Sequence, residues 1–114
     1  MSDNFRKSNR LLSKHDYANV FSNKPKKMHH KNFLILAVSN NLETARIGLA
    51  VSKKHCKKAV DRNKIKRIVR EIFRKNKKSL KSMDLVFLSK PGLHLYSKSE
   101  LYSIIQPLII KVGI

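Results

Sequence analysis

Residues 57–78 read KKAVDRNKIKRIVREIFRKNKK, and this stretch combines an apolar and a basic pattern. At about 3.6 residues per helical turn, five apolar side chains share one helical face. They are Ile65, Ile68, Val69, Ile72 and Phe73. The opposite face carries Asn63, Lys66, Arg67, Arg70 and Arg74. The stretch therefore predicts a long helix, beginning between Lys57 and Asp61, that packs one face on a core and exposes a basic ridge.

Two side chains of this helix need a separate explanation. Arg62 falls on the apolar side of the helix. Either a specific acceptor holds its guanidinium, or the side chain reaches past the helix end into water. Glu71 is placed to pair with Arg67 or Lys75, each four residues away.

The charge of the chain is strongly positive and concentrated around this helix. The 114 residues include 26 Lys and Arg against 7 Asp and Glu, which gives a net charge of +19. Fourteen of the basic residues and two of the acidic ones lie between Lys53 and Lys81. Such a field destabilises the compact state by self-repulsion unless a polyanion neutralises it. Because neutralised phosphates release counterions, we predict a nucleic-acid-binding protein.

A shorter helix is predicted near the N-terminus. Ser13 is a typical capping residue, and Tyr17, Val20 and Phe21 follow at the spacing of one helical face. Residues 25–31, which combine a proline with polar side chains, are predicted to form a loop.

Three apolar segments are predicted to be strands: 33–38 (FLILAV), 46–52 (RIGLAVS) and 84–88 (DLVFL). In the second, large and small side chains alternate, so that Gly48 and Ala50 share a face. Small side chains on a strand allow a helix or a ligand backbone to approach closely, and both interpretations are open.

The last predicted element is a helix that opens with a capping box at Ser97 and Glu100. We expect Pro107 to kink this helix or to end it early. The order of elements indicates an α+β fold in which helices layer on a small sheet. The length fits one RNA-binding domain over residues 1–114.

Four stretches carry a family resemblance. They are residues 9–21 (NRLLSKHDYANVF), 46–54 (RIGLAVSKK), 59–71 (AVDRNKIKRIVRE) and 84–92 (DLVFLSKPG). The third contains an Arg-Asn-x-x-Lys-Arg core at residues 62–67. The similarity extends over nearly the whole chain and includes these four stretches, and the chain resembles the protein subunit of bacterial ribonuclease P.

The resemblance implies a single-domain αβββαβα sandwich with a small mixed sheet and a left-handed βαβ crossover. It also implies a function: to assist a catalytic RNA in the endonucleolytic removal of the 5′ leader from precursor tRNA. Ribonuclease P would then be the holoenzyme, with the catalytic centre and its Mg²⁺ in the RNA subunit. No catalytic residue, metal or cofactor is expected on the protein alone.

The resemblance further implies two sets of binding residues. Those expected to contact the catalytic RNA are Lys53, Lys54, Arg62, Asn63, Lys66, Arg67, Arg70 and Arg74. Those expected in a cleft for the single-stranded 5′ leader are Tyr17, Phe21, Phe33 and Leu36. Aromatic faces suit unstacked bases, whereas packing into the core is the alternative for Tyr17 and Phe21. We expect Tyr17 to be the more exposed of the two.

Other functional classes fit the sequence less well. An independent nuclease needs clustered carboxylates or a His pair, but the acids are scattered and His29-His30 has no obvious third metal ligand. A ribosomal protein or RNA chaperone shares the composition and lacks the motif at residues 62–67. Membrane binding conflicts with the core role of the apolar helical stripe.

Compartment and partners are also expectations at this point. The partners are the ribonuclease P RNA and precursor tRNA, with no membrane and no obligate protein partner. Cys56 cannot form an internal disulfide, which favours the cytoplasm. Its basic neighbours leave a choice between a thiol of lowered pKa and an ordinary turn residue.

Overall fold

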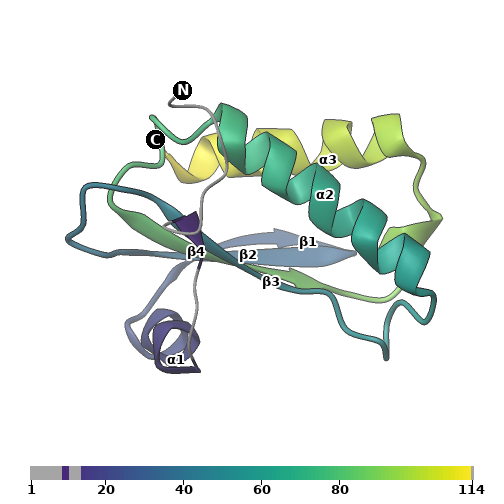
Figure 1. The fold of residues 1–114 in the computed structure, drawn as a ribbon, viewed down its shortest axis with the longest axis horizontal. Helices are drawn as coiled ribbons and strands as arrows, with labels where there is room; N and C mark the ends of the chain where they lie inside the picture. Colours follow the sequence, from purple (N-terminus) through teal and green to yellow (C-terminus); the bar gives the residue numbers. More distant parts are fainter. Residues whose placement is uncertain (1–8, 11–13, 114) are drawn as a thin grey trace.

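The computed structural model describes residues 9–10 and 14–113, and it confirms the α+β fold (Figure 1). In chain order the elements are α1 (Lys14–Ser22), β1 (Lys26–His30), β2 (Phe33–Ser39), β3 (Arg46–Ala50), α2 (Ala59–Lys75), β4 (Met83–Ser89), the 3-10 helix η2 (Leu93–Leu95) and α3 (Lys98–Val112). The predicted cap Ser13 lies outside the described residues.

β1 is a strand where the residue pattern predicted a loop, and it is the first of the three strands before α2 that the family resemblance implied. It pairs antiparallel with β2, from Lys26 opposite Ala37 to His30 opposite Phe33. Met28 is the one buried residue of the five in β1, so the segment shows no apolar periodicity of its own. β1 lies at the edge of the sheet, where lysines are common because they discourage pairing with other chains.

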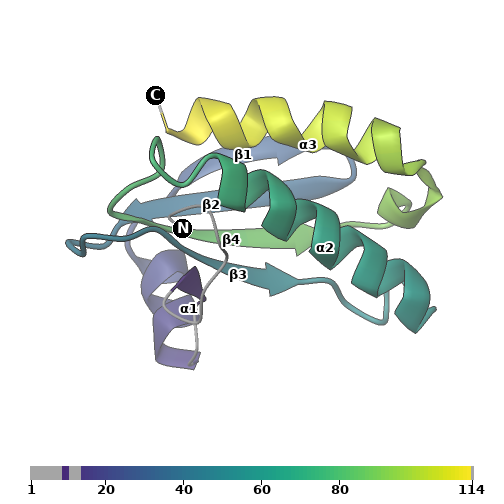
Figure 2. The same cartoon turned by 45° about the horizontal axis from the view of Figure 1, so that its top comes forward.

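The described strands form one mixed sheet in the order β1-β2-β4-β3. β3 and β4 are parallel, whereas the other neighbours are antiparallel. Figure 2 shows β3 and β4 pointing to the right, α2 in front of the sheet and β4 above β3, which makes the crossover left-handed. Crossovers between parallel strands are right-handed in almost all proteins, so this is the exception that the family resemblance implied.

Helices cover both faces of this sheet. α2 and α3 lie together on one face, and α1 lies on the other (Figure 1). Because side chains alternate along a strand, β2 contributes to both sides. Phe33 and Ile35 join the large core under α2 and α3, whereas Leu36 and Val38 join a smaller cluster under α1.

α3 follows the sequence prediction at its start, and of the two outcomes expected at Pro107 an early end does not occur. The capping box is present, with Glu100 N–H donating to Ser97 Oγ at 3.2 Å and Ser97 N–H donating to Glu100 Oε1 at 2.8 Å. The helix does not end early but continues to Val112. Pro107 and Ser103 are both on the exposed side, so the Ser103 carbonyl that loses its helical donor can bind water instead.

Candidate nucleic-acid interface

The core-facing stripe of α2 is the one that the sequence predicted. All five apolar residues are buried, from Phe73 at 0 % exposure to Ile68 at 2 %. They pack in the large cluster between the sheet and α3. The orientation of α2 is therefore fixed by its apolar face, and its other face is directed away from the core.

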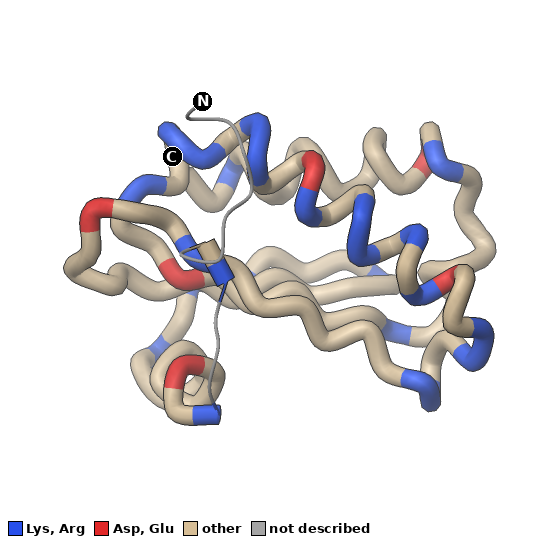
Figure 3. Tube along the Cα trace, in the orientation of Figure 1, with Lys and Arg blue, Asp and Glu red and all other residues tan. Residues whose placement is uncertain are grey.

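Lys and Arg residues occur along the length of α2 (Figure 3), and the face opposite the buried stripe carries several of them. Asn63 and Arg67 are exposed, and Arg70 and Arg74 are half-buried. Together with Glu71 these residues line a shallow depression of about 360 Å³. Burial and, to a smaller extent, the nearby charge of Arg10 lower the pKa of Arg70.

Glu71 is the acid on this ridge, and its partners differ in part from those predicted. Arg74 Nη2 donates to Glu71 Oε1 at 2.6 Å, and Lys75 Nζ lies 3.6 Å from the same oxygen. The hydrogen bond from Arg74 lowers the pKa of the Glu71 carboxyl. The pairing with Lys75 is confirmed, and the structure gives Arg74 in place of Arg67 as the second partner.

Arg62 is held by specific acceptors at the start of α2. Its Nη1 donates to the carbonyl oxygen of Cys56 at 3.1 Å and to that of Lys57 at 2.8 Å. Of the two explanations left open by the sequence, the first is therefore correct. The Arg62 side chain thus connects the first turn of α2 with the loop that precedes it.

That loop extends the basic surface beyond α2. Lys53 and Lys54 are exposed, and Lys54 borders a depression of about 490 Å³ together with His55 and Lys58. Cys56, in contrast, is buried at 2 % exposure, and burial raises the pKa of its thiol. The interpretation of Cys56 as a reactive thiol of lowered pKa is wrong, because the side chain lies in the core, where burial outweighs the lowering effect of Arg62 and Lys64.

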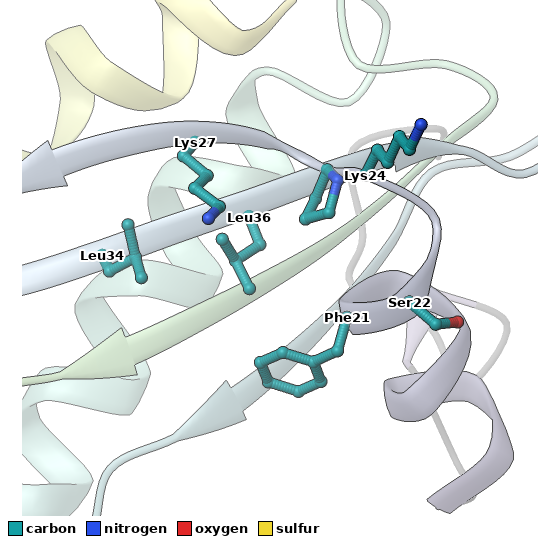
Figure 4. A pocket seen from close by; sticks show the side chains of 7 residues that line it. Phe21, Ser22, Lys24, Lys27, Leu34 and Leu36 are labelled. Atoms are coloured by element: carbon teal, nitrogen blue, oxygen red, sulfur yellow. The ribbon is translucent and has the colours of Figure 1, made fainter.

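A second candidate surface lies on the opposite side of the sheet, beside α1. There a groove of about 610 Å³ runs between the end of α1 and strands β1 and β2. Figure 4 shows the Phe21 ring projecting from α1, with Leu34 and Leu36 of β2 as neighbours. Lys24 and Lys27 also line the groove, so an apolar floor is combined with cationic groups at its border.

Tyr17 lies deeper than Phe21, which reverses the expected order. Phe21 is 50 % exposed, whereas Tyr17 is half-buried and packs on the small cluster under α1. A Cβ atom added at Gly48 would lie 2.5 Å from Tyr17 Cε1. The small face of β3 therefore serves helix packing, one of the two interpretations that the sequence left open.

Comparison with known proteins places the chain in a family. The family model described as Ribonuclease P matches residues 5–113 of the chain. The chain belongs to the ribonuclease P protein family. The ribonuclease P protein component of Marinobacter nauticus is 49 % identical over 89 residues, which are 78 % of this chain and 67 % of that protein. The corresponding component of Nitrosococcus oceani is 44 % identical over 92 residues, 81 % of this chain and 76 % of that protein.

A solved structure of the same family has the same fold. The ribonuclease P protein from Thermotoga maritima superimposes with a TM-score of 0.76 at 30 % sequence identity. The superposition covers 90 % of this chain and 96 % of that one. Fold and sequence therefore agree on membership of the ribonuclease P family.

Within this ribonuclease P fold, Phe33 is misplaced by the sequence prediction. Its side chain is buried at 0 % exposure and stacks on Phe87, with ring centroids 5.3 Å apart, in the core under α2 and α3. The expectation that Phe33 lies beside the groove is wrong, because it points to the opposite face of β2. The neighbouring Leu34 lines the groove instead, together with the predicted Leu36.

Lys24 and Lys27 are groove residues that the sequence prediction missed. Lys27 belongs to β1, the strand that was assigned to a loop, and its partner in the sheet is Leu36. With that strand recognised, the alternation of side chains would have placed Lys27 on the same face as Leu36.

Two further observations concern the described part of this ribonuclease P protein. Among residues 9–10 and 14–113, no three His, Cys, Asp or Glu side chains come together in a group that could hold a metal ion. No helix in the same ranges combines the length and the apolar character needed to cross a bilayer.

Proposed function

We propose that this chain is the protein subunit of a ribonuclease P holoenzyme and uses its two surfaces for two different RNAs. The ridge on α2 binds the catalytic RNA, and the groove beside α1 binds the 5′ leader of precursor tRNA. The observation that carries this proposal is the separation of the two surfaces, which lie on opposite faces of one sheet. One domain can then hold the catalytic RNA and the leader at the same time.

The α2 ridge is suited to the backbone of a folded RNA. Arg67 and Arg70 present planar guanidinium groups that can bind phosphate with two hydrogen bonds. Arg74 adds positive charge beside them, while its Nε and Nη2 donate to Glu71. Asn63 and Lys66 add hydrogen-bond donors beside them, and Lys53 and Lys54 extend the surface. Arg62 contributes through the fold, because its guanidinium already donates to two carbonyl oxygens.

The groove beside α1 is suited to a single strand with little sequence preference. The half-exposed ring of Phe21 offers a stacking face, and Leu34 and Leu36 form an apolar floor. Lys24 and Lys27 border it at positions where they can reach phosphates. Aromatic stacking tolerates any base and contributes about 1–3 kcal/mol per base.

The chemistry belongs to the RNA in this proposal. The catalytic RNA holds the Mg²⁺ that supports hydrolysis, and the protein binds and orients the substrate. We place the assembly in the cytoplasm, with the catalytic RNA and precursor tRNA as partners and without an obligate protein partner. Residues 1–114 act as one RNA-binding domain.

Reconstitution tests this function. Cleavage of a 5′-extended tRNA is measured at low Mg²⁺ with the protein alone, with a ribonuclease P RNA alone and with both. We expect no cleavage by the protein alone and faster cleavage by the combination than by the RNA. Cleavage by the RNA-free protein, or no gain from its addition, would contradict the proposal.

Two substitutions separate the surfaces. Arg67→Ala should weaken binding of the catalytic RNA and reduce the slope of log K against log salt by about one. Lys98→Ala on α3 is the control of equal charge.

Phe21→Ala should weaken binding of leader-bearing tRNA by about 1 kcal/mol and leave binding of mature tRNA unchanged. Ile110→Ala is the apolar control. Equal losses for a variant and its control would remove that surface from the proposal.

A further inference from the structure

α1 forms one wall of the groove, yet apolar burial holds it only weakly. Of its nine residues, all described, Val20 is the one that is buried. Tyr17 adds a half-buried contact against Gly48. So small an apolar contact does not by itself fix the angle of a helix on a sheet, and a polar contact supplies a second constraint.

That polar contact begins at a buried carboxylate of β4. Asp84 is 0 % exposed and accepts two hydrogen bonds from Arg46 of β3, from Nε at 2.9 Å and from Nη2 at 2.6 Å. Asn40 Nδ2 donates to the same carboxylate at 2.8 Å. Two parallel hydrogen bonds fix the plane of the Arg46 guanidinium, and the bonding to Asp84 raises the pKa of Arg46.

The same guanidinium reaches across to α1. Arg46 Nη1 lies 3.7 Å from Asp16 Oδ1, and both side chains are about one-fifth exposed, at 22 % and 21 %. Asp16 directly precedes Tyr17 in the first half of the helix. One arginine thus connects the buried Asp84 of the sheet with the end of α1 that lies over β3.

Phe21 stands on the other half of the same helix. It follows Asp16 by five residues, which is about 7.5 Å along the axis. A change of angle at the Asp16 end therefore moves the Phe21 ring relative to Leu34 and Leu36.

We propose that Arg46, oriented by Asp84, is a positioning residue that sets the width of the leader groove by holding α1 through Asp16. This inference rests on the proposed function of the groove. Neither Arg46 nor Asp16 contacts the leader in this proposal. Substitution of either residue changes leader binding because it changes the position of the Phe21 ring.

Asp16→Asn tests the ion pair between Asp16 and Arg46, which we call the bridge. The substitution removes the charge of Asp16 and keeps its volume and a carbonyl acceptor. Its matched control is Glu43→Gln, which changes the net charge equally at a side chain that is 96 % exposed. Both variants are assembled with a ribonuclease P RNA. Binding of leader-bearing and mature tRNA and the melting temperature of the free protein are then measured.

We expect Asp16→Asn to lower the preference for leader-bearing over mature tRNA by roughly two- to fivefold, the factor that corresponds to a partly exposed ion pair. Glu43→Gln should leave this preference unchanged. An equal effect of the two variants, or an equal loss of leader-bearing and mature tRNA with Asp16→Asn, would overturn the inference.

A second variant changes the other partner of the ion pair, Arg46. It distinguishes loss of the ion pair from an effect of Asp16→Asn on the α1 helix itself. Arg46→Lys keeps the charge next to Asp84 and loses the fork that reaches two elements. The double variant with Asp16→Asn should lower the leader preference no further than either change alone, because both break one contact. Additive losses would show that the two side chains act separately and would overturn the bridge.

Phe21→Ala, run in parallel, separates this inference from the proposed function. If Phe21→Ala lowers the leader preference and Asp16→Asn does not, the groove is retained and Arg46 is not a positioning residue. If Phe21→Ala has no effect on the preference, the leader groove is wrong, and the role of Arg46 is overturned with it.

Discussion

Arg62 closes the loop that leads into α2, because its guanidinium donates to the carbonyl oxygens of Cys56 and Lys57. Removing these two charge-assisted hydrogen bonds should therefore affect the free protein. We expect Arg62→Met to lower the free energy of unfolding by about 1–2 kcal/mol, measured by urea denaturation without RNA. The helical periodicity placed Arg62 on the apolar side but could not identify its acceptors, since these depend on how the preceding loop folds back.

Arg67→Met is the matched control for this prediction. Arg67 belongs to the same helix, is exposed and carries the same charge. A substitution at such a surface position should change the free energy of unfolding by less than about 0.5 kcal/mol. If the two variants are equally stable, the carbonyl contacts of Arg62 contribute nothing to the fold.

We expect His30 to make the stability of the fold depend on pH. Its Nδ1 accepts a hydrogen bond from Asn32 N–H at 3.0 Å, and its ring stacks on Phe33 at 4.6 Å. Burial, with smaller contributions from Lys31 and Lys90, lowers the pKa of His30 below its ordinary value of 6.5. The unfolded state therefore binds more protons between the two pKa values. The contribution of His30 to stability is complete above pH 6.5 and is lost as the pH falls through the folded-state pKa.

Urea denaturation at pH 7.5 and pH 5.5 measures this contribution. The free energy of unfolding should fall between these pH values in the wild-type protein, and it should fall less in His30→Gln. The same decrease in both proteins would assign the pH dependence to other groups.

At the scale of single elements, the strands show what residue patterns can and cannot predict. The apolar segments of β2, β3 and β4 are long enough to indicate strands by themselves. β1 is recognisable only through its partner, because its pairing with β2 and not its own composition makes it a strand. A strand that forms mainly through pairing with its neighbour is difficult to predict from a single sequence.

The two faces of β2 illustrate a second limit. Alternation shows that Phe33 and Ile35 share a face and that Leu34 and Leu36 share the other. It does not show which face meets α1 and which meets α2 and α3, since both faces are apolar and both are covered. The misplacement of Phe33 follows from this ambiguity, whereas the stripe of α2 was predictable because its other face is charged.

The contact between α1 and β3 leads to a prediction about Gly48. An added Cβ would lie between 2.5 and 2.6 Å from two ring carbons and the hydroxyl oxygen of Tyr17, so the side chain must move. We expect Gly48→Ala to lower the free energy of unfolding by about 1–3 kcal/mol, the usual cost of overpacking. The measurement is urea denaturation of the free protein.

A double-mutant cycle identifies the cause. With Tyr17→Ala in place, the added methyl group no longer meets the ring. Gly48→Ala should then cost much less than it does alone. An unchanged cost would point to the backbone of β3 and would remove Tyr17 from the explanation.

At the scale of the whole molecule, the topology was accessible only through the family resemblance. The order of helices and strands follows from the residue patterns, but the handedness of the β3-α2-β4 crossover does not. General rules favour the right-handed form. The motif at residues 62–67 therefore carried more information about the topology than composition or periodicity did.

The net charge of +19 acts on the molecule as a whole. Lys and Arg residues occur along α2 and in the loops at both of its ends (Figure 3), so folding brings like charges together. Salt screens this repulsion, because the Debye length shortens from roughly 20 Å at about 0.02 M to about 7 Å at about 0.2 M. We expect the melting temperature of the free protein to rise by about 5 °C over this range of NaCl, equivalent to about 1 kcal/mol.

A charge-reduced variant distinguishes general screening from other effects of salt. Replacing the four exposed lysines of the loop before α2, Lys53, Lys54, Lys57 and Lys58, by Gln removes positive charge without touching a buried side chain. This variant should melt at a higher temperature than the wild type at low salt and should gain less from added NaCl. Salt also weakens the ion pair between Arg46 and Asp84, which lowers the melting temperature. The burial of Asp84 limits that decrease. A melting temperature that stays constant or falls with salt would show that self-repulsion does not limit the stability of the fold.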